Sequence, residues 1–209
     1  MATNAYLTLE ELRSYVGVSA ASDTADLDDV LTAASRMVDR YCGRHFYQAT
    51  AEAREFDVDS DGYTVTLGPF NDLVSLTTFA YDNNDDGTYE STISASGYQL
   101  LAPPQGQAPA QWPYQQIRVL TTTVLPYAPT ALGRIDLIRL TGTWGWPAVP
   151  PEVKQATRIL AAELYKLADA PMGVAGFGEF GVVRLGRQLP ARAQQLLQPF
   201  RHPLNVGLA

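Results

Sequence analysis

The sequence predicts an α+β protein in which a helical frame is interrupted by an antiparallel β-domain. Two observations indicate this class. Apolar residues recur at helical spacing before residue 43 and again after residue 150. Between about residues 54 and 143 they recur at every second position, with Thr, Val, Ile and Tyr enriched between clusters of Gly, Asn, Asp and Pro. We therefore expect two N-terminal helices, an inserted antiparallel β-domain and two C-terminal helices.

The composition suits one globular domain or two small ones. The chain has 209 residues, of which 46% are hydrophobic and 18% charged, and this excludes collagen-like, mucin-like and wholly disordered classes. Its net charge of -7 is unevenly distributed. Residues 1–111 carry 17 acidic and 5 basic side chains, whereas residues 112–209 carry 5 acidic and 10 basic ones. This polarity predicts different surroundings for the two parts of the chain.

No apolar run approaches the roughly 18 residues that a membrane span needs. The first residues also lack a basic segment followed by an apolar one, so we expect neither a membrane anchor nor a secretory leader. The single cysteine, Cys42, lies on an apolar helix face, which favours a packed core thiol over a nucleophile.

The two N-terminal helices are predicted by capping signals and apolar spacing. Thr8 and Glu11 form a capping box for a short helix that Gly17 ends. A longer helix follows and stops at Gly43. Its apolar face is made of Leu27, Val30, Leu31, Ala34, Met37, Val38, Tyr41 and Cys42.

The middle of the chain is predicted as a meander-like antiparallel sheet. The alternating segments are residues 63–67, 73–81, 98–101, 117–120 and 135–141. A loop is expected at residues 102–113, because proline cannot donate to a sheet ladder.

Helix returns at Pro151, which suits a first helical position, and continues until Pro171. Residues 172–190 hold five glycines without a clear period, so we expect a loop that is mobile in the isolated subunit. A last short helix is expected from about Ala191 to Pro199. The predicted organisation is thus residues 1–53 for the N-terminal helices, 54–143 for the β insertion, 144–171 for the third helix, and 172–209 for a glycine-rich arm with a C-terminal helix that docks on a partner.

Two acidic segments imitate a calcium-binding loop. Asp57, Asp59 and Asp61 precede Gly62, and a second segment, residues 82–87, has the same pattern. The twelfth position, which should supply a bidentate Glu, is occupied by Gly68 in the first segment and Ile93 in the second. Ordinary hairpin turns are therefore favoured, and these three aspartates remain only weak candidates for a metal site.

No cofactor or reaction is indicated by the other motifs. The glycines of residues 176–181 match a dinucleotide-binding spacing, but they follow a predicted helix rather than a strand. His45 and His202 belong to no recognisable metal or nucleophile set, which disfavours a hydrolase. The arginines of the last quarter are spread among Leu and Phe, and this favours docking onto an acidic protein surface over DNA binding.

Three segments of the helical frame resemble a known family. They are ASRMVDRYCGRHF (34–46), TGTWGWPAVPPEVKQAT (141–157) and GEFGVVRLGR (178–187), the last followed by LLQPFR (196–201). Together they resemble the head-to-tail connector, or adaptor, proteins of long-tailed double-stranded DNA bacteriophages. The likeness covers about half of the chain, and residues 54–133 match only in their β character.

The resemblance implies a non-enzymatic structural protein of the virion neck, made in the bacterial cytoplasm. It implies a homo-oligomeric ring, usually of twelve copies, that binds the portal and meets the next connector or a tail protein. Double-stranded DNA would pass through its channel without specific binding, past a wall that the carboxylates of residues 1–111 are able to build. The implied portal-docking residues are Phe180, Val183, Arg184, Leu185, Arg187, Leu196, Leu197, Phe200 and Arg201.

Two alternatives stay open at this point. One is another neck or tail ring component, such as a stopper or a tail terminator. The other is a calcium-dependent binding module. Under the adaptor hypothesis we also expect that a chain lacking residues 180–209 still folds.

Overall fold

The structure is a computed structural model that describes residues 4–18, 24–103, 112–120, 125, 136–168, 174–176, 182–184 and 189–205. The chain divides into two compact units. One is a helical unit made of residues 1–43 and 149–209, and the other is a β unit made of residues 44–148. Helices at both ends with antiparallel sheets between them confirm the predicted α+β class.

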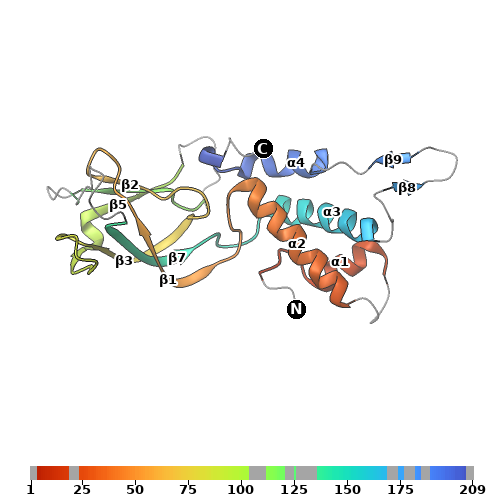
Figure 1. Ribbon diagram of the computed structural model, residues 1–209, viewed down its shortest axis with the longest axis horizontal. Coiled ribbons are helices and arrows are strands. Elements are labelled where there is room, and N and C mark those ends of the chain that lie inside the picture. Colours follow the sequence, from red (N-terminus) through yellow and green to blue (C-terminus); the bar gives the residue numbers. More distant parts are fainter. Residues whose placement is uncertain are drawn as a thin grey trace. The chain divides into compact units, whose positions relative to one another are not determined.

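The helical unit contains α1 (Leu9–Val16), α2 (Thr24–Cys42), α3 (Pro151–Ala168) and α4 (Ala191–Leu197) (Figure 1). Short 3-10 turns follow at Gln198–Phe200 and Pro203–Asn205. The capping box at Thr8 is present, and Gly17 ends α1 in the left-handed conformation with φ 74°. The four helices predicted from the sequence are thus confirmed.

Helix α3 packs against α1, α2 and α4 within this unit. The apolar faces predicted from the spacing of α2 and α3 form the core between them. Fully buried members of this core are Leu12, Leu27, Leu31, Ala34, Val38, Cys42, Val153, Ala156, Leu160, Ala193 and Leu197. Cys42 is therefore a packed core thiol, as its position on α2 predicts. No helix among the described residues is long and apolar enough to span a membrane.

The β unit contains two antiparallel sheets rather than one. The first has the order β1-β7-β3-β4, with β1 at Ala49–Phe56, β7 at Ile138–Trp144, β3 at Leu73–Tyr81 and β4 at Ser91–Ile93. The second has the order β2-β6-β5, with β2 at Thr64–Thr66, β6 at Gln116–Val119 and β5 at Tyr98–Leu101. A 3-10 turn, Ala95–Gly97, lies just before β5.

The expected meander is wrong in two respects. β7 lies between β1 and β3, so the last strand of the unit pairs with its first, and β1 itself was not among the predicted strands. β1 is an edge strand on which seven of eight residues are exposed or half-exposed and only Phe56 is buried, so it shows little apolar alternation. Apolar side chains from both sheets nevertheless share one core, which includes Phe56, Val65, Leu73, Phe79, Ile117, Val119, Ile138, Leu140 and Trp144.

A buried ion pair lies at one end of the β unit. The guanidinium of Arg44 binds the carboxylate of Asp72, and each side chain is 1% exposed. The second carboxylate oxygen accepts a hydrogen bond of 3.0 Å from the indole nitrogen of Trp146. The guanidinium carbon also lies 5.3 Å from the ring centre of Trp112, so an aromatic face covers the charge.

Burial raises the pKa of Asp72 more than the opposing effects of Arg44 and of the hydrogen bond from Trp146 lower it. The charged form of this carboxylate therefore depends on its partner. An arginine, in contrast, keeps its charge whatever surrounds it.

Replacing Asp72 and replacing Arg44 should lower the free energy of unfolding by unequal amounts. Asp72→Asn leaves a permanent charge buried without its counter-charge, and we expect a loss of about 3–5 kcal/mol in the free energy of unfolding. Arg44→Met should cost less, because the carboxyl of Asp72 can bind a proton. With the folded-state pKa raised above the unfolded value, the stability of Arg44→Met should increase as the pH falls toward the unfolded-state pKa of an aspartate, about 3.9. Urea unfolding at several pH values measures both effects.

The exposed pair of Glu55 and Arg139 provides the control. Its atoms are 2.6 Å apart, but both side chains are more than two-fifths exposed. Glu55→Gln should therefore change the unfolding free energy by only about 0–1 kcal/mol. Equal losses for Asp72→Asn and Glu55→Gln would contradict the importance given to the buried pair.

Candidate interaction surfaces

A short β-hairpin lies in the segment predicted as a loop. β8 (Val174–Gly176) and β9 (Val182–Arg184) pair antiparallel, with Ala175 opposite Val183 (Figure 1). The loop prediction for residues 172–190 is therefore wrong at these six positions. Each strand has only three residues, which is too short for an alternating pattern to be recognised, although valine favours strands.

The residues implied in portal docking lie in two places. Phe180, Leu185 and Arg187 lie outside the described residues. The mobility predicted around them also concerns positions outside the described residues. The backbones of Val183 and Arg184 form part of β9. The remaining four, Leu196, Leu197, Phe200 and Arg201, lie in α4 and the turn that follows it.

These last four side chains differ in accessibility. Leu197 is 0% exposed and Phe200 is 7% exposed, so both belong to the core of the helical unit. Leu196 and Arg201 are half-buried. A partner could reach Leu197 and Phe200 only if α4 left α3. Docking through α4 as it stands would use Leu196, Arg201 and the exposed residues beside them, among them Arg192.

The end of this segment is held on α2. The backbone amide of His202 donates a 2.7 Å hydrogen bond to the carbonyl of Cys42. The guanidinium of Arg201 lies 5.1 Å from the ring centre of Tyr41. Residues 180–209 contain four arginines and no Asp or Glu, so the segment presents a positive charge. Beyond it, Leu204 is 64% exposed.

The β unit presents the opposite charge. Residues 44–148 contain eleven acidic and five basic side chains. Among the described residues, its exposed carboxylates are Glu52, Glu55, Asp57, Asp61, Asp85, Asp86 and Glu90. Two of its arginines already bind two of them, Arg54 to Glu52 at 3.0 Å and Arg139 to Glu55 at 2.6 Å. The surface of this unit therefore carries an excess of negative charge.

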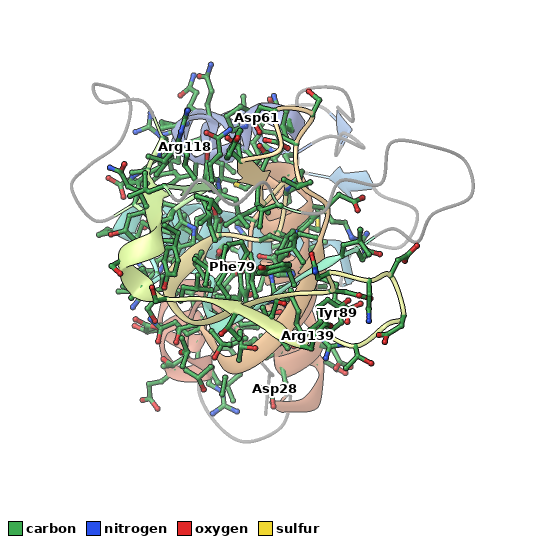
Figure 2. All side chains as sticks on the ribbon, turned by 90° about the vertical axis from the view of Figure 1, so that its left-hand side faces the viewer. Asp28, Asp61, Phe79, Tyr89, Arg118 and Arg139 are labelled. Carbon is green, nitrogen blue, oxygen red and sulfur yellow. The ribbon has the colours of Figure 1, made fainter. Side chains whose placement is uncertain are left out.

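The longest acidic turn, residues 82–90, is tied to the sheet. The hydroxyl of Tyr89 donates a 2.7 Å hydrogen bond to the carbonyl of Asp136, and the guanidinium of Arg139 lies 3.8 Å from the ring centre of Tyr89 (Figure 2). At the other end of the turn, the buried carboxylate of Asp82 accepts hydrogen bonds from four backbone amides, at 2.6 Å from Gly87 and 2.8–3.3 Å from residues 84–86. Desolvation of Asp82 opposes its ionisation, but these amides outweigh it and lower its pKa.

The three weak metal candidates all accept hydrogen bonds in the structure. Asp61 accepts hydrogen bonds from the amides of Tyr63 and Thr64 at 2.9 and 2.8 Å. Asp59 accepts one from the Thr66 hydroxyl at 2.7 Å, and Asp57 accepts one from the amide of Asp136 at 2.7 Å. The bonds of Asp61 are the Asx-type chemistry of a tight turn, whereas those of Asp59 and Asp57 join residues farther apart in the chain. All of them occupy oxygens that a cation would need.

A different carboxylate group has the spacing to hold a metal among the described residues. It consists of Asp82, Asp86 and Glu90, whose ligand atoms lie within 4.8 Å of one another. The sequence pattern indicated Asp82 and Asp86 but not Glu90. Because both oxygens of Asp82 already accept amides, a cation would have to displace hydrogen bonds that shape the turn.

The fold defines the class of protein, namely a helical frame into which a two-sheet β unit is inserted. No family model matches the sequence, and neither does any curated protein. Solved structures match the fold. A chain in a structure described as the neck of an empty gene transfer agent particle, computed with C6 symmetry, has a TM-score of 0.57 and 20% identity, with 96% of this chain and 92% of that chain covered.

A chain of the virion of a native gene transfer agent particle has a TM-score of 0.58 and 22% identity, with the same shares covered. The fold is thus shared over nearly the whole length of both chains. A helical frame with a β insertion is therefore an architecture already present in solved structures.

Calcium should leave the protein unchanged if its acidic turns are only structural. We expect no heat in calorimetry with calcium and no change in melting temperature, because the oxygens of Asp61 and Asp82 are taken by backbone amides. Glu90→Gln is the matched variant, since it removes one carboxylate of the spaced group. A melting temperature that rises with calcium in the native chain but not in Glu90→Gln would reveal a binding site there.

Proposed function

We propose that this protein is a structural component of the neck of a phage-like particle, where it acts as a head-tail adaptor. The observation that carries the proposal is the fold shared over 96% of the chain with chains from the neck and virion of a gene transfer agent. The connector-like motifs at residues 34–46 and 141–157 support it independently, because they include the end of α2 and the start of α3.

In this proposal the copies form a ring by joining unlike faces, and the family resemblance implies twelve copies. A ring needs a heterologous contact in which one face of a subunit meets a different face of its neighbour. The carboxylates of the β unit and the acid-free segment 180–209 give each copy two faces of opposite charge. Such complementarity favours one register of assembly and disfavours contacts between like faces.

The arm between α3 and α4 is the proposed portal-docking element. It includes β8 and β9, and with them Val183 and Arg184. Leu196 and Arg201 extend the proposed contact onto the accessible side of α4. The opposite side of the ring would meet the next connector or a tail protein, and a carboxylate-lined channel would let DNA pass because like charges repel.

The role is that of a scaffold, without catalysis. The gene transfer agent chains that share the fold come from a neck and a virion. A stopper or a tail terminator is the alternative within the same class. The identity of the binding partner distinguishes them, because an adaptor binds the portal whereas a terminator binds the tail tube.

Docking can be tested by replacing residues 174–184 with Gly and Ser in equal number. Helix α4 and its contacts with α3 stay intact in this variant, so its melting temperature should match that of the native chain. We expect the variant to lose its joining to portal-containing heads, measured by cosedimentation.

Deletion of residues 180–209, in contrast, removes the buried Ala193 and Leu197 and should destabilise the helical unit, which corrects the expectation that the truncated chain folds.

A matched control changes an exposed turn of the β unit instead. Asp85→Asn lies in the acidic turn and should leave head joining unchanged. Normal joining by the Gly and Ser variant, or an equal loss for Asp85→Asn, would contradict the assignment of docking to the arm.

The channel proposal predicts weak binding of double-stranded DNA. Repulsion by the carboxylates of the β unit should keep the protein from shifting DNA in a gel at physiological salt. A tight complex at that salt would argue against a non-binding channel wall.

A further inference from the structure

The hairpin of β8 and β9 has no third strand among the described residues. Its two strands form a sheet of their own, and neither joins either sheet of the β unit. An isolated two-stranded hairpin is marginally stable at best in water, because it lacks a further strand or a packing surface to support it. An additional strand would therefore give this hairpin the support that it lacks as a two-stranded sheet.

Its edges also lack the features that keep strands apart. The edge strand β1 is guarded by a bulge at Ala51, which has φ 56°, and by Glu52, Arg54 and Glu55. The six residues of β8 and β9 carry one charge, that of Arg184, and no proline lies between residues 171 and 190. Open edges with so little charge are templates for strand pairing.

We propose that β9 of one copy pairs with β8 of the next copy, so that the hairpins join edge to edge around the ring. The proposal rests on the ring assembly proposed above. Each hairpin has two different free edges, and head-to-tail pairing between copies uses both. Because β8 and β9 run in opposite directions, every contact between successive hairpins is antiparallel.

A second copy fits these edges better than a strand from another protein. One foreign strand would cover one edge and leave the other open, whereas a closed ring of identical hairpins leaves none. The length of the segment that connects the hairpin to α3 agrees with this. Residues 169–173 join the hairpin to α3, and five residues reach at most about 17 Å. The added strand must therefore come from a molecule that lies close to the helical unit, as a neighbour in the ring does.

Pairs of chains, each with one introduced cysteine, test the proposal in rings assembled on portal-containing heads. Ala175→Cys in β8 is mixed in turn with Val182→Cys, Val183→Cys or Arg184→Cys in β9. One of these three β9 cysteines then lies opposite the β8 cysteine of the next copy in whichever register the two strands pair. The native Cys42 is 0% exposed and does not interfere. We expect oxidation to give a disulfide-linked dimer in at least one mixture and none when each variant is assembled alone. Thr92→Cys, in the edge strand β4, replaces Ala175→Cys as the control and should give no dimer with any of them.

Three results would overturn the proposal. Dimers from Ala175→Cys alone would mean that like edges meet. Rings seen by electron microscopy without a dimer in any mixture would mean that the hairpin pairs elsewhere, and the proposed adaptor role would then stand without this contact. Absence of any ring on the heads would overturn both the contact and the proposed function.

Discussion

The β unit depends on a charge pair that water does not reach. Arg44 lies two residues after the end of α2, Asp72 precedes β3, and Trp146 lies two residues after β7, so one buried group joins three distant parts of the chain. Two unpaired charges at this depth would each cost several kcal/mol, which makes the position of each segment depend on the others. The ends of the central strands β3 and β7 are thereby fixed together, and the acidic turns at the other strand ends extend from a framework of defined geometry.

The helical frame could be predicted because its signals are local. A capping box at Thr8 and apolar spacing in α2 and α3 lie within a few turns of sequence. The order of the sheets could not be predicted in the same way. It depends on pairings such as Ala53 with Thr141, which join residues far apart in the chain, and β1 shows little alternation because most of its side chains face water.

The apolar residues implied in docking could not be distinguished from core residues in the sequence, for a physical reason. Leu197 and Phe200 have the apolar character of docking residues, but the same character suits the core in which they lie. Asp72 belongs to no motif, and Arg44 lies in the connector-like segment 34–46 without any local sign of burial, so nothing in the sequence distinguishes their buried charges from exposed ones. The turn chemistry of Asp61 was more accessible, since the bonds of an Asx turn join residues two or three positions apart.

The acidic turn of residues 82–90 has one more consequence. Asp82 at its start and Tyr89 near its end fix the backbone before anything touches it. A molecule that meets Asn83, Asn84, Asp85 or Asp86 would find their backbone already in place and would lose little additional conformational entropy there. Contact with this turn should consequently form with a small thermodynamic penalty.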